Sequence, residues 1–82
     1  LKVSPNPFNS MCTISFILKK SNEVTLILYN IKGELVARKK LGLLYKGNHE
    51  ISWSPDNFPS GTYFMKTQTA SFSEYSKILY LK

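Results

Sequence analysis

Hydrophobic and polar positions alternate over several short stretches of the chain. The clearest stretch is residues 12–18, where the even-numbered positions hold Cys, Ile, Phe and Leu and two of the three odd-numbered positions are Thr and Ser. A period of two predicts a β-strand with one buried face. Residues 24–29 and 49–53 alternate in the same way, and residues 1–4 fit a short first strand. We find no helical period that could compete with these strands.

The end of the chain carries the strongest hairpin pattern. Residues 60–67 and 75–82 are rich in aromatic and branched side chains, and the short segment between them is mostly polar. This arrangement predicts a β-hairpin. Chain ends usually fray unless they are held in place, so we expect strand character up to Lys82 and a last strand that the domain needs.

Turn residues separate the other strands. Asn30 and Gly33 occupy the first and fourth positions of a predicted type I turn, with Gly33 in a left-handed conformation. The returning strand covers residues 34–40, residues 41–47 are expected to be irregular, and residues 54–61 form a turn-rich corner. Tyr63 is expected to point inward, with its hydroxyl bonded to backbone near this corner.

Six to seven short strands in a chain of this length indicate a sandwich or a small barrel. We predict an all-β fold, an immunoglobulin-like antiparallel β-sandwich of about seven short strands. The 82 residues suffice for a single domain, which buries only about 60–65% of the surface of the unfolded chain. The chain starts with Leu1 and shows neither a leader nor a membrane-spanning run, so we interpret residues 1–82 as one module cut from a larger protein.

The net charge of +6 is unevenly distributed. Residues 1–46 hold eight Lys or Arg against two Glu, whereas residues 47–82 hold three of each sign. Lys19–Lys20 and Arg38–Lys40 fall at predicted strand ends, where charge prevents pairing with other sheets. An anionic surface, such as lipopolysaccharide or a membrane, is the next interpretation. Nucleic acid is a poor third, because no aromatic residue is interleaved with lysine as a base-stacking platform would need.

Few residues suit catalysis or metal binding. His49 is the only histidine, and its alternation with Ile51 and Trp53 favours a packed side chain over a general base. Cys12, the only cysteine, excludes an internal disulfide and is expected in the core. Asp56 in the corner lacks the further oxygen ligands that Ca²⁺ requires. We therefore expect no enzyme, no cofactor and no metal, and we expect Trp53 in the core instead of on a sugar-stacking surface.

Five motifs in order along the chain resemble one known family. They are Ser4–Asn9 (SPNPFN), Val24–Val36 (VTLILYNIKGELV), Ser52–Trp53, Ser60–Phe64 (SGTYF) and Lys77–Leu79 (KIL). Together they resemble the C-terminal sorting domain of type IX secretion substrates, type A. The pattern is also similar to the immunoglobulin-like domain of flagellar hook-capping proteins.

The resemblance implies a β-sandwich that is appended to secreted bacterial proteins. In that family the domain takes a cargo from the periplasm across the outer membrane through the type IX translocon and its shuttle, so the cargo is secreted or placed on the cell surface. A sortase-like peptidase then usually removes the domain and can link the cargo to anionic lipopolysaccharide. The positions that match family motifs structurally are Pro5, Asn6, Pro7, Phe8, Gly33 and Trp53.

The terminal hairpin is where the strand pattern and the family resemblance coincide. We expect the secretion machinery to recognise this hairpin, and the candidate recognition residues are Gly61, Tyr63, Lys77, Leu79, Leu81 and Lys82. Three other functions stay open: a passive spacer, a carbohydrate-binding sandwich of a secreted hydrolase, or a hook-capping immunoglobulin-like domain. A carbohydrate-binding domain should show exposed aromatic side chains in a row.

Overall fold

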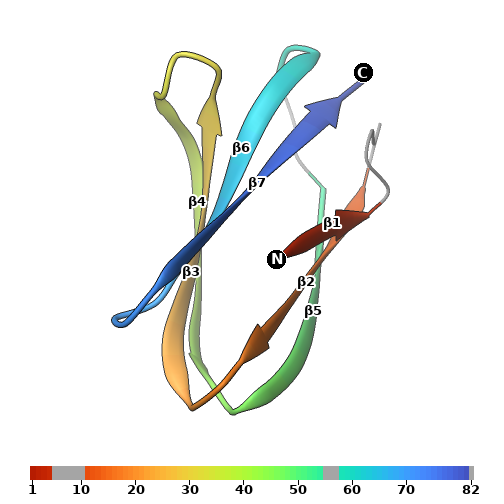
Figure 1. Ribbon diagram of the computed structural model, residues 1–82. Coiled ribbons are helices and arrows are strands. Elements are labelled where there is room, and N and C mark those ends of the chain that lie inside the picture. Colours follow the sequence, from red (N-terminus) through yellow and green to blue (C-terminus); the bar gives the residue numbers. More distant parts are fainter. Residues whose placement is uncertain (5–10, 55–57, 82) are drawn as a thin grey trace.

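Seven β-strands build the protein in the computed structural model, which describes residues 1–4, 11–54 and 58–81 (Figure 1). No helix occurs among these residues. The strands are β1 (Lys2–Ser4), β2 (Cys12–Leu18), β3 (Asn22–Asn30), β4 (Leu35–Leu44), β5 (Gly47–Trp53), β6 (Gly61–Gln68) and β7 (Ser73–Tyr80).

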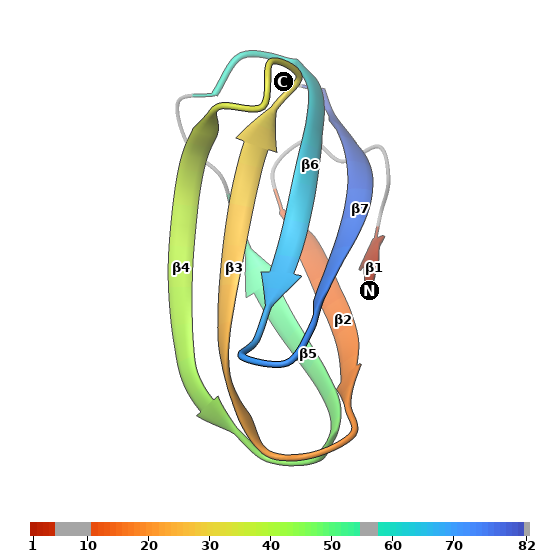
Figure 2. The same cartoon turned by 60° about the vertical axis from the view of Figure 1, so that its left-hand side comes forward.

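The strands form two antiparallel sheets that lie face to face (Figure 2). One sheet has the order β1-β2-β5 and the other the order β4-β3-β6-β7. This confirms the predicted seven-stranded, immunoglobulin-like sandwich. The fourth strand pairs with β3 and so belongs to the larger sheet.

The core lies between the two sheets and is supplied by alternate residues of the central strands. In β2 the even-numbered side chains are buried, as predicted, and Cys12 is 1% exposed. The inward side chains of β3 and β6 meet them from the other sheet. The fully enclosed members are Cys12, Ile14, Leu18, Val24, Met65, Thr67 and Ile78. Four of these seven are aliphatic and only Thr67 carries a hydroxyl, which suits a small domain that depends on apolar burial for its stability.

The predicted turn between β3 and β4 is confirmed. The backbone N–H of Gly33 donates to the carbonyl of Asn30 at 3.0 Å. The side-chain oxygen of Asn30 accepts hydrogen bonds from the backbone N–H groups of Lys32 and Glu34. Gly33 has a φ of +83°, a left-handed value that glycine adopts at little cost. The turn therefore fixes the register of the β3–β4 hairpin.

The expectation for residues 41–47 was wrong in part. β4 continues through them as far as Leu44 and reaches this length through a β-bulge at Leu41, because Thr25 pairs with Lys40 while Val24 pairs with Gly42. Arg38–Lys40 consequently lies in the middle of β4, not at a strand end. β4 is an edge strand of its sheet, so three consecutive cations there still oppose pairing with another molecule.

The last strand is shorter than expected. β7 ends at Tyr80, so the prediction of strand character up to the last residue was wrong. The loop before β7 is short: the Thr69 hydroxyl accepts from the N–H of Phe72 at 3.1 Å, and Thr69 N–H donates to the Phe72 carbonyl at 2.9 Å. These bonds start β7 at Ser73. Predictions for Pro5, Asn6, Pro7, Phe8, Asp56 and Lys82 fall outside the described residues.

Candidate functional site

β7 presents two different faces along its length. Ile78 and Tyr80 point inward and are 1% and 5% exposed, because they complete the core opposite β2. Lys77 and Leu79 alternate with them and point outward, as does Tyr75. The strand lies at the edge of the four-stranded sheet, with β6 as its neighbour. The terminal hairpin is therefore bound to the core on one side and open to other molecules on the other.

Strand register places further outward side chains beside those of β7. Phe64 pairs with Lys77 and with Tyr29, while Lys66 pairs with Tyr75 and with Ile27. Across β3, Ile27 pairs with Arg38 and Thr25 pairs with Lys40. We call the surface made by these outward residues the basic-aromatic face. Its members are Ile27, Tyr29, Arg38, Lys40, Phe64, Lys66, Tyr75, Lys77 and Leu79.

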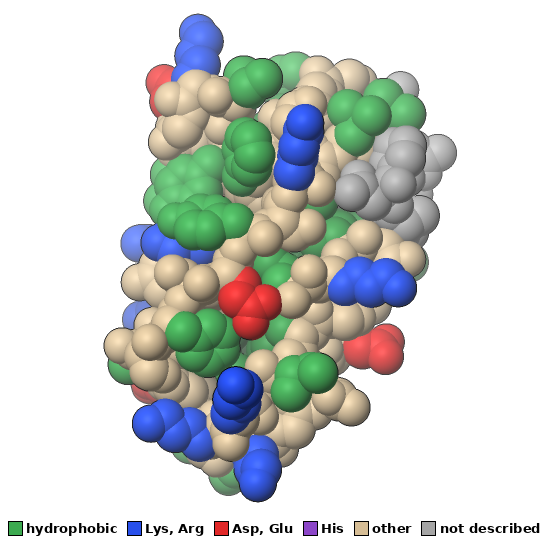
Figure 3. All heavy atoms as spheres, viewed as in Figure 1, with side chains coloured by type: hydrophobic (Ala, Val, Ile, Leu, Met, Phe, Trp, Pro, Cys, Tyr) green, Lys and Arg blue, Asp and Glu red, His purple; other side chains and the backbone are tan. Residues whose placement is uncertain are grey.

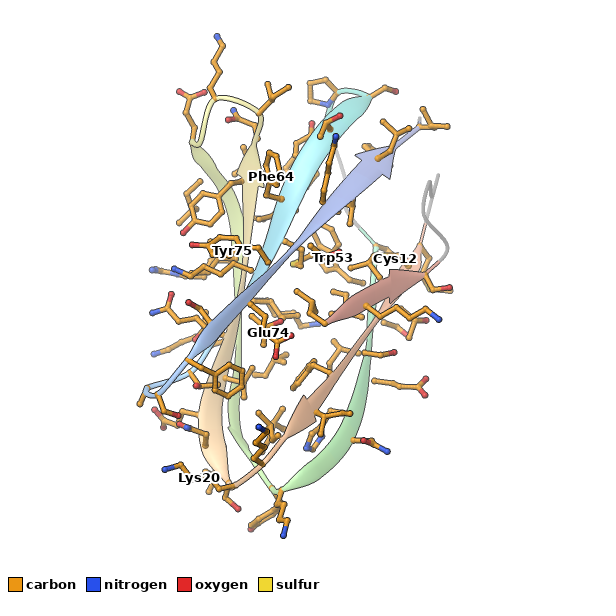
Figure 4. All side chains as sticks on the ribbon, viewed as in Figure 1. Cys12, Lys20, Trp53, Phe64, Glu74 and Tyr75 are labelled. Carbon is orange, nitrogen blue, oxygen red and sulfur yellow. The ribbon has the colours of Figure 1, made fainter. Side chains whose placement is uncertain are left out.

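The basic-aromatic face carries charge of one sign. Of the outward positions on β4, β3, β6 and β7 within the described residues, four are Lys or Arg and one is acidic: Glu23, near the start of β3, where it pairs with Leu43. Hydrophobic and basic side chains lie close together on the side of the molecule to the left of β7 (Figure 3). Phe64 and Tyr75 point to this side, away from Trp53 and Cys12 in the interior (Figure 4). Such a surface favours an anionic partner that also offers apolar contact.

Lys66 and Tyr75 are in direct contact on this face. The Lys66 Nζ lies 5.5 Å from the centre of the Tyr75 ring, a cation–π distance. Tyr75 is itself 60% exposed, so this ring is held in place while most of it stays open to solvent. The ring can therefore contact a partner without losing much side-chain freedom.

Gly61 and Tyr63 belong to the corner before the hairpin and not to the basic-aromatic face. The Tyr63 hydroxyl donates a hydrogen bond to the carbonyl of Pro59 at 2.6 Å, which confirms the predicted bond to the corner. Tyr63 is 6% exposed and lies inward, between Phe58 and Tyr80. Gly61 pairs with Tyr80 at the start of β6. These two residues shape the hairpin from within, whereas Lys77 and Leu79 are the predicted residues that a partner can touch.

Leu81 follows β7 and is 46% exposed, so it is also accessible. Phe64, Lys66 and Tyr75 were not among the predicted recognition residues. The alternation along residues 61–68 and 73–80 was a signal that could have identified them, because it places them on the side of Lys77 and Leu79. Their proximity to Arg38 and Lys40 requires the sheet order and could not have been read from the sequence.

The side chains that could take part in catalysis or ligand binding are engaged in packing. His49 stacks on Phe16 with ring centres 5.6 Å apart, and its Nε2 lies 2.6 Å from the carbonyl oxygen of Tyr45. Trp53 is half-buried and packs beside Phe58. Burial raises the pKa of the Cys12 thiol from 9.0 to about 11, so this thiol stays protonated at neutral pH.

The described ranges lack two further kinds of feature. They hold no group of three or more His, Cys, Asp or Glu side chains arranged to bind a metal ion. They also form no helix of the length and apolarity that crossing a membrane would take.

A known protein family matches nearly the whole chain. The family described as the secretion system C-terminal sorting domain matches residues 2–81, which is nearly the whole chain. No curated protein and no solved structure is significantly similar to the chain. A match of this extent covers all seven strands, including the corner and the terminal hairpin. The chain therefore belongs to the family of C-terminal sorting domains of the type IX secretion system.

Proposed function

We propose that this domain directs a cargo protein across the outer membrane through the type IX translocon, and that the translocon or its shuttle docks on the outward side of the terminal hairpin. The chain belongs to a family of sorting domains, and the observation that carries the proposal is the position of β7. β7 is an edge strand that holds Lys77 and Leu79 outward and buries Ile78 and Tyr80. The hairpin thus displays its outer side chains only when the domain is folded.

A rigid β-sandwich suits this task physically. A signal that is read on a folded cargo needs side chains held at fixed spacing, because ordering them during binding would cost affinity. β6 and β7 are paired over eight positions, from Gly61 with Tyr80 to Gln68 with Ser73. This ladder keeps Tyr75, Lys77 and Leu79 in a fixed row.

The proposal extends to what happens after transport. We infer that a sortase-like peptidase removes the domain, and that the cargo is then released or attached to the surface. Anionic lipopolysaccharide is a partner whose charge suits the basic-aromatic face, because all of its charged members are basic: Arg38, Lys40, Lys66 and Lys77. Among the described outward positions of this sheet, Glu23 offsets only one of these four charges.

The most direct test of the function asks whether residues 1–82 alone can export an unrelated reporter. Residues 1–82 are fused to the C-terminus of a periplasmic fluorescent reporter in a bacterium that has type IX secretion, and reporter is measured in the periplasm, on the surface and in the medium. We expect export that is lost in a strain without the translocon. Retention of a folded fusion in the periplasm would reject the proposal and favour a spacer or a hook-capping-like domain.

Deletion of the last strand would be a poor test. Removing residues 75–82 takes away Ile78 and Tyr80, so loss of export could result from unfolding alone. Substitutions confined to outward residues of β7 avoid this problem.

The basic-aromatic face favours a second candidate function, the binding of an anionic polysaccharide. Tyr29, Phe64 and Tyr75 are aromatic residues on adjacent strands, and sugars stack on such rings. Trp53 does not take part, because it is half-buried on the inner side. Titration of the purified domain with lipopolysaccharide tests this candidate: Tyr75→Ala should weaken binding, and equal binding by the variant would count against it.

A further inference from the structure

β1 covers only part of its neighbour. β2 pairs with β5 along its full length, from Cys12 with Trp53 to Leu18 with Gly47. On its other side, among the described residues, β2 pairs with β1 at three positions: Ser15 with Lys2, Ile14 with Val3 and Thr13 with Ser4. Residues 16–18 of β2 therefore have no strand partner on that side within the described part of the chain.

A groove lies beside this unpaired half of β2. Two open cavities of about 500 Å³ each share Ile17 and Glu74 as lining residues, so they adjoin. One extends to Leu1 and His49, and the other to Lys19, Lys20 and Phe72. Glu74 lies between β7 and β1, and Lys20 lies at the lower end of β2 (Figure 4). We call this surface the β2 groove.

The β2 groove has exposed apolar side chains, and covering them would remove apolar surface from water, which is favourable. Ile17 is 65% exposed and Phe72 is 36% exposed. Unpaired backbone beside exposed apolar side chains is the arrangement that accepts an added β-strand. β1, the short strand paired at this edge, reaches only as far as Lys2 opposite Ser15, so it does not cover the groove.

The register of β1 determines what would enter the groove. Pairs between β1 and β2 run in opposite directions, so continuing the ladder backward places Leu1 opposite Phe16. The residue before Leu1 would then lie opposite Ile17, and the one before that opposite Leu18. Leu1 already packs on the core and lines the same cavity as Phe16, which agrees with this register.

We propose that the segment joining a cargo to Leu1 continues β1 along the lower half of β2 and fills the β2 groove. This inference rests on the proposed function, in which a cargo precedes the domain. The ladder between β1 and β2 favours this occupant over a second copy or a separate protein, because the added strand continues an existing pairing. Here it completes β1 and closes the side of the sandwich where β2 and β7 are open.

The groove also specifies the chemistry of the joining segment. The position directly before Leu1 would share the outer side with Ile17, so a β-branched residue suits it. The third and fourth positions before Leu1 would lie near Lys19 and Lys20, so acidic residues suit them. The Leu1 nitrogen lies 2.6 Å from Glu74 Oε2, and in a joined chain it would be an amide N–H that can still donate to this carboxylate.

Two fusions of the reporter to residues 1–82 test the inference. In the first, Glu-Glu-Val-Val directly precedes Leu1. In the second, the same four residues are separated from Leu1 by Gly-Ser-Gly-Ser, which gives equal composition without strand continuity. Hydrogen exchange of the backbone amides at residues 16–18 is measured on both purified fusions. We expect exchange to be slowed about tenfold in the first fusion relative to the second, as a few added cross-strand contacts would produce.

An Ile17→Asp variant of both fusions shows where the joining segment lies. Its carboxylate would lie opposite the valine that directly precedes Leu1, on the same side as the glutamate three positions before Leu1. It offers no apolar contact there, so we expect the difference between the two fusions to disappear. Equal exchange in the two unsubstituted fusions would overturn the inference. Slowing that survives Ile17→Asp would overturn it too, because the segment would then lie elsewhere, for instance along β7.

A concentration-dependent slowing, with dimers detected by light scattering, would show that a second copy fills the groove and would also overturn the inference. These measurements need no secretion system. A negative result here would leave the export test of the proposed function unaffected, and failure of export would not change the exchange rates.

Discussion

At the scale of single residues, Tyr63 connects the corner before β6 with the core. Its ring is buried beside Phe58 and Tyr80, and its hydroxyl reaches back to the Pro59 carbonyl. The residue therefore supports the hairpin from inside. A family motif that contains it reports on the stability of the fold more directly than on contact with a partner.

Replacing Tyr63 with Phe removes this hydrogen bond and keeps the ring. The Pro59 carbonyl would lose its donor in a partly buried corner, so we expect the free energy of unfolding to fall by about 1–3 kcal/mol in urea titrations. Tyr75→Phe is the matched control, because Tyr75 is 60% exposed, and it should change stability by less than about 0.5 kcal/mol. Equal effects of the two variants would contradict this role for Tyr63.

Cys12 makes stability depend on pH in the alkaline range. Burial raises the pKa of its thiol to about 11, whereas the unfolded chain ionises near 9.0. Between these values the unfolded state loses the proton and the folded state keeps it, so stability falls as pH rises from 9 to 11. This difference between the two pKa values lowers the free energy of unfolding by about 3 kcal/mol at most.

The contribution of Cys12 is isolated by subtraction. The free energy of unfolding is measured from pH 7 to 11 for the wild type and for Cys12→Ala, because tyrosine and lysine titrate in both proteins. We expect the difference between the two curves to be constant below pH 9 and to shrink above it. A constant difference across the whole range would show that the thiol is not protected.

At the scale of elements, the β3–β4 turn is set by two residues. Asn30 holds the turn with its side chain, and Gly33 supplies the left-handed backbone. A Cβ at Gly33 would meet no atom within 4 Å, so only backbone conformation opposes a substitution.

Gly33→Ala should therefore destabilise the domain by about 1 kcal/mol, the cost of a left-handed alanine. Gly33→Asn should cost less, because asparagine enters this region more readily. Urea unfolding of both variants measures the difference. If alanine and asparagine cost the same, backbone strain at residue 33 would not be the cause.

Most elements could be predicted from the sequence because their alternation is local. The limits of β2 agree to the residue, since its buried side chains follow a strict period of two. β4 was cut short because Leu41 and Gly42 interrupt the period, and a bulge that lets a strand continue looks like a loop in the sequence. β7 was extended too far, because Leu81 suits a strand by composition but lies beyond the last paired position, Tyr80.

At the scale of the whole molecule, the sequence could not predict the basic-aromatic face. Arg38 and Lys77 are brought onto one surface by the order β4-β3-β6-β7, and pairing between strands far apart in sequence is not encoded in local alternation. Residues 47–82 carry no net charge, yet the same strand order brings Lys66 and Lys77 of this segment onto a basic surface.

The sandwich also depends on β7 for its stability. Ile78 is 1% exposed and pairs with Tyr63, so Ile78→Ala should cost about 2–5 kcal/mol. A domain of this size has about 4–12 kcal/mol in total, so this loss would bring it close to unfolding. Leu79→Ala, on the outward side of the same strand, should cost less than about 1 kcal/mol by urea unfolding. A small cost for Ile78→Ala would show that β7 is not part of the core.

One pair of variants tests the docking of the secretion machinery on β7 most directly. In the reporter fusion, Lys77→Glu and Leu79→Ser are combined on β7. The matched control combines Lys39→Glu and Leu43→Ser at exposed positions of β4, the opposite edge of the same sheet. Both pairs make the same changes of charge and polarity, and thermal unfolding first establishes that both fusions are folded.

The measured quantity is the fraction of reporter exported through the translocon. We expect the β7 variant to lose most of its export and the β4 variant to keep nearly all of it, because only β7 displays the outward row of the terminal hairpin. Equal export by the two folded fusions would contradict docking on the terminal hairpin.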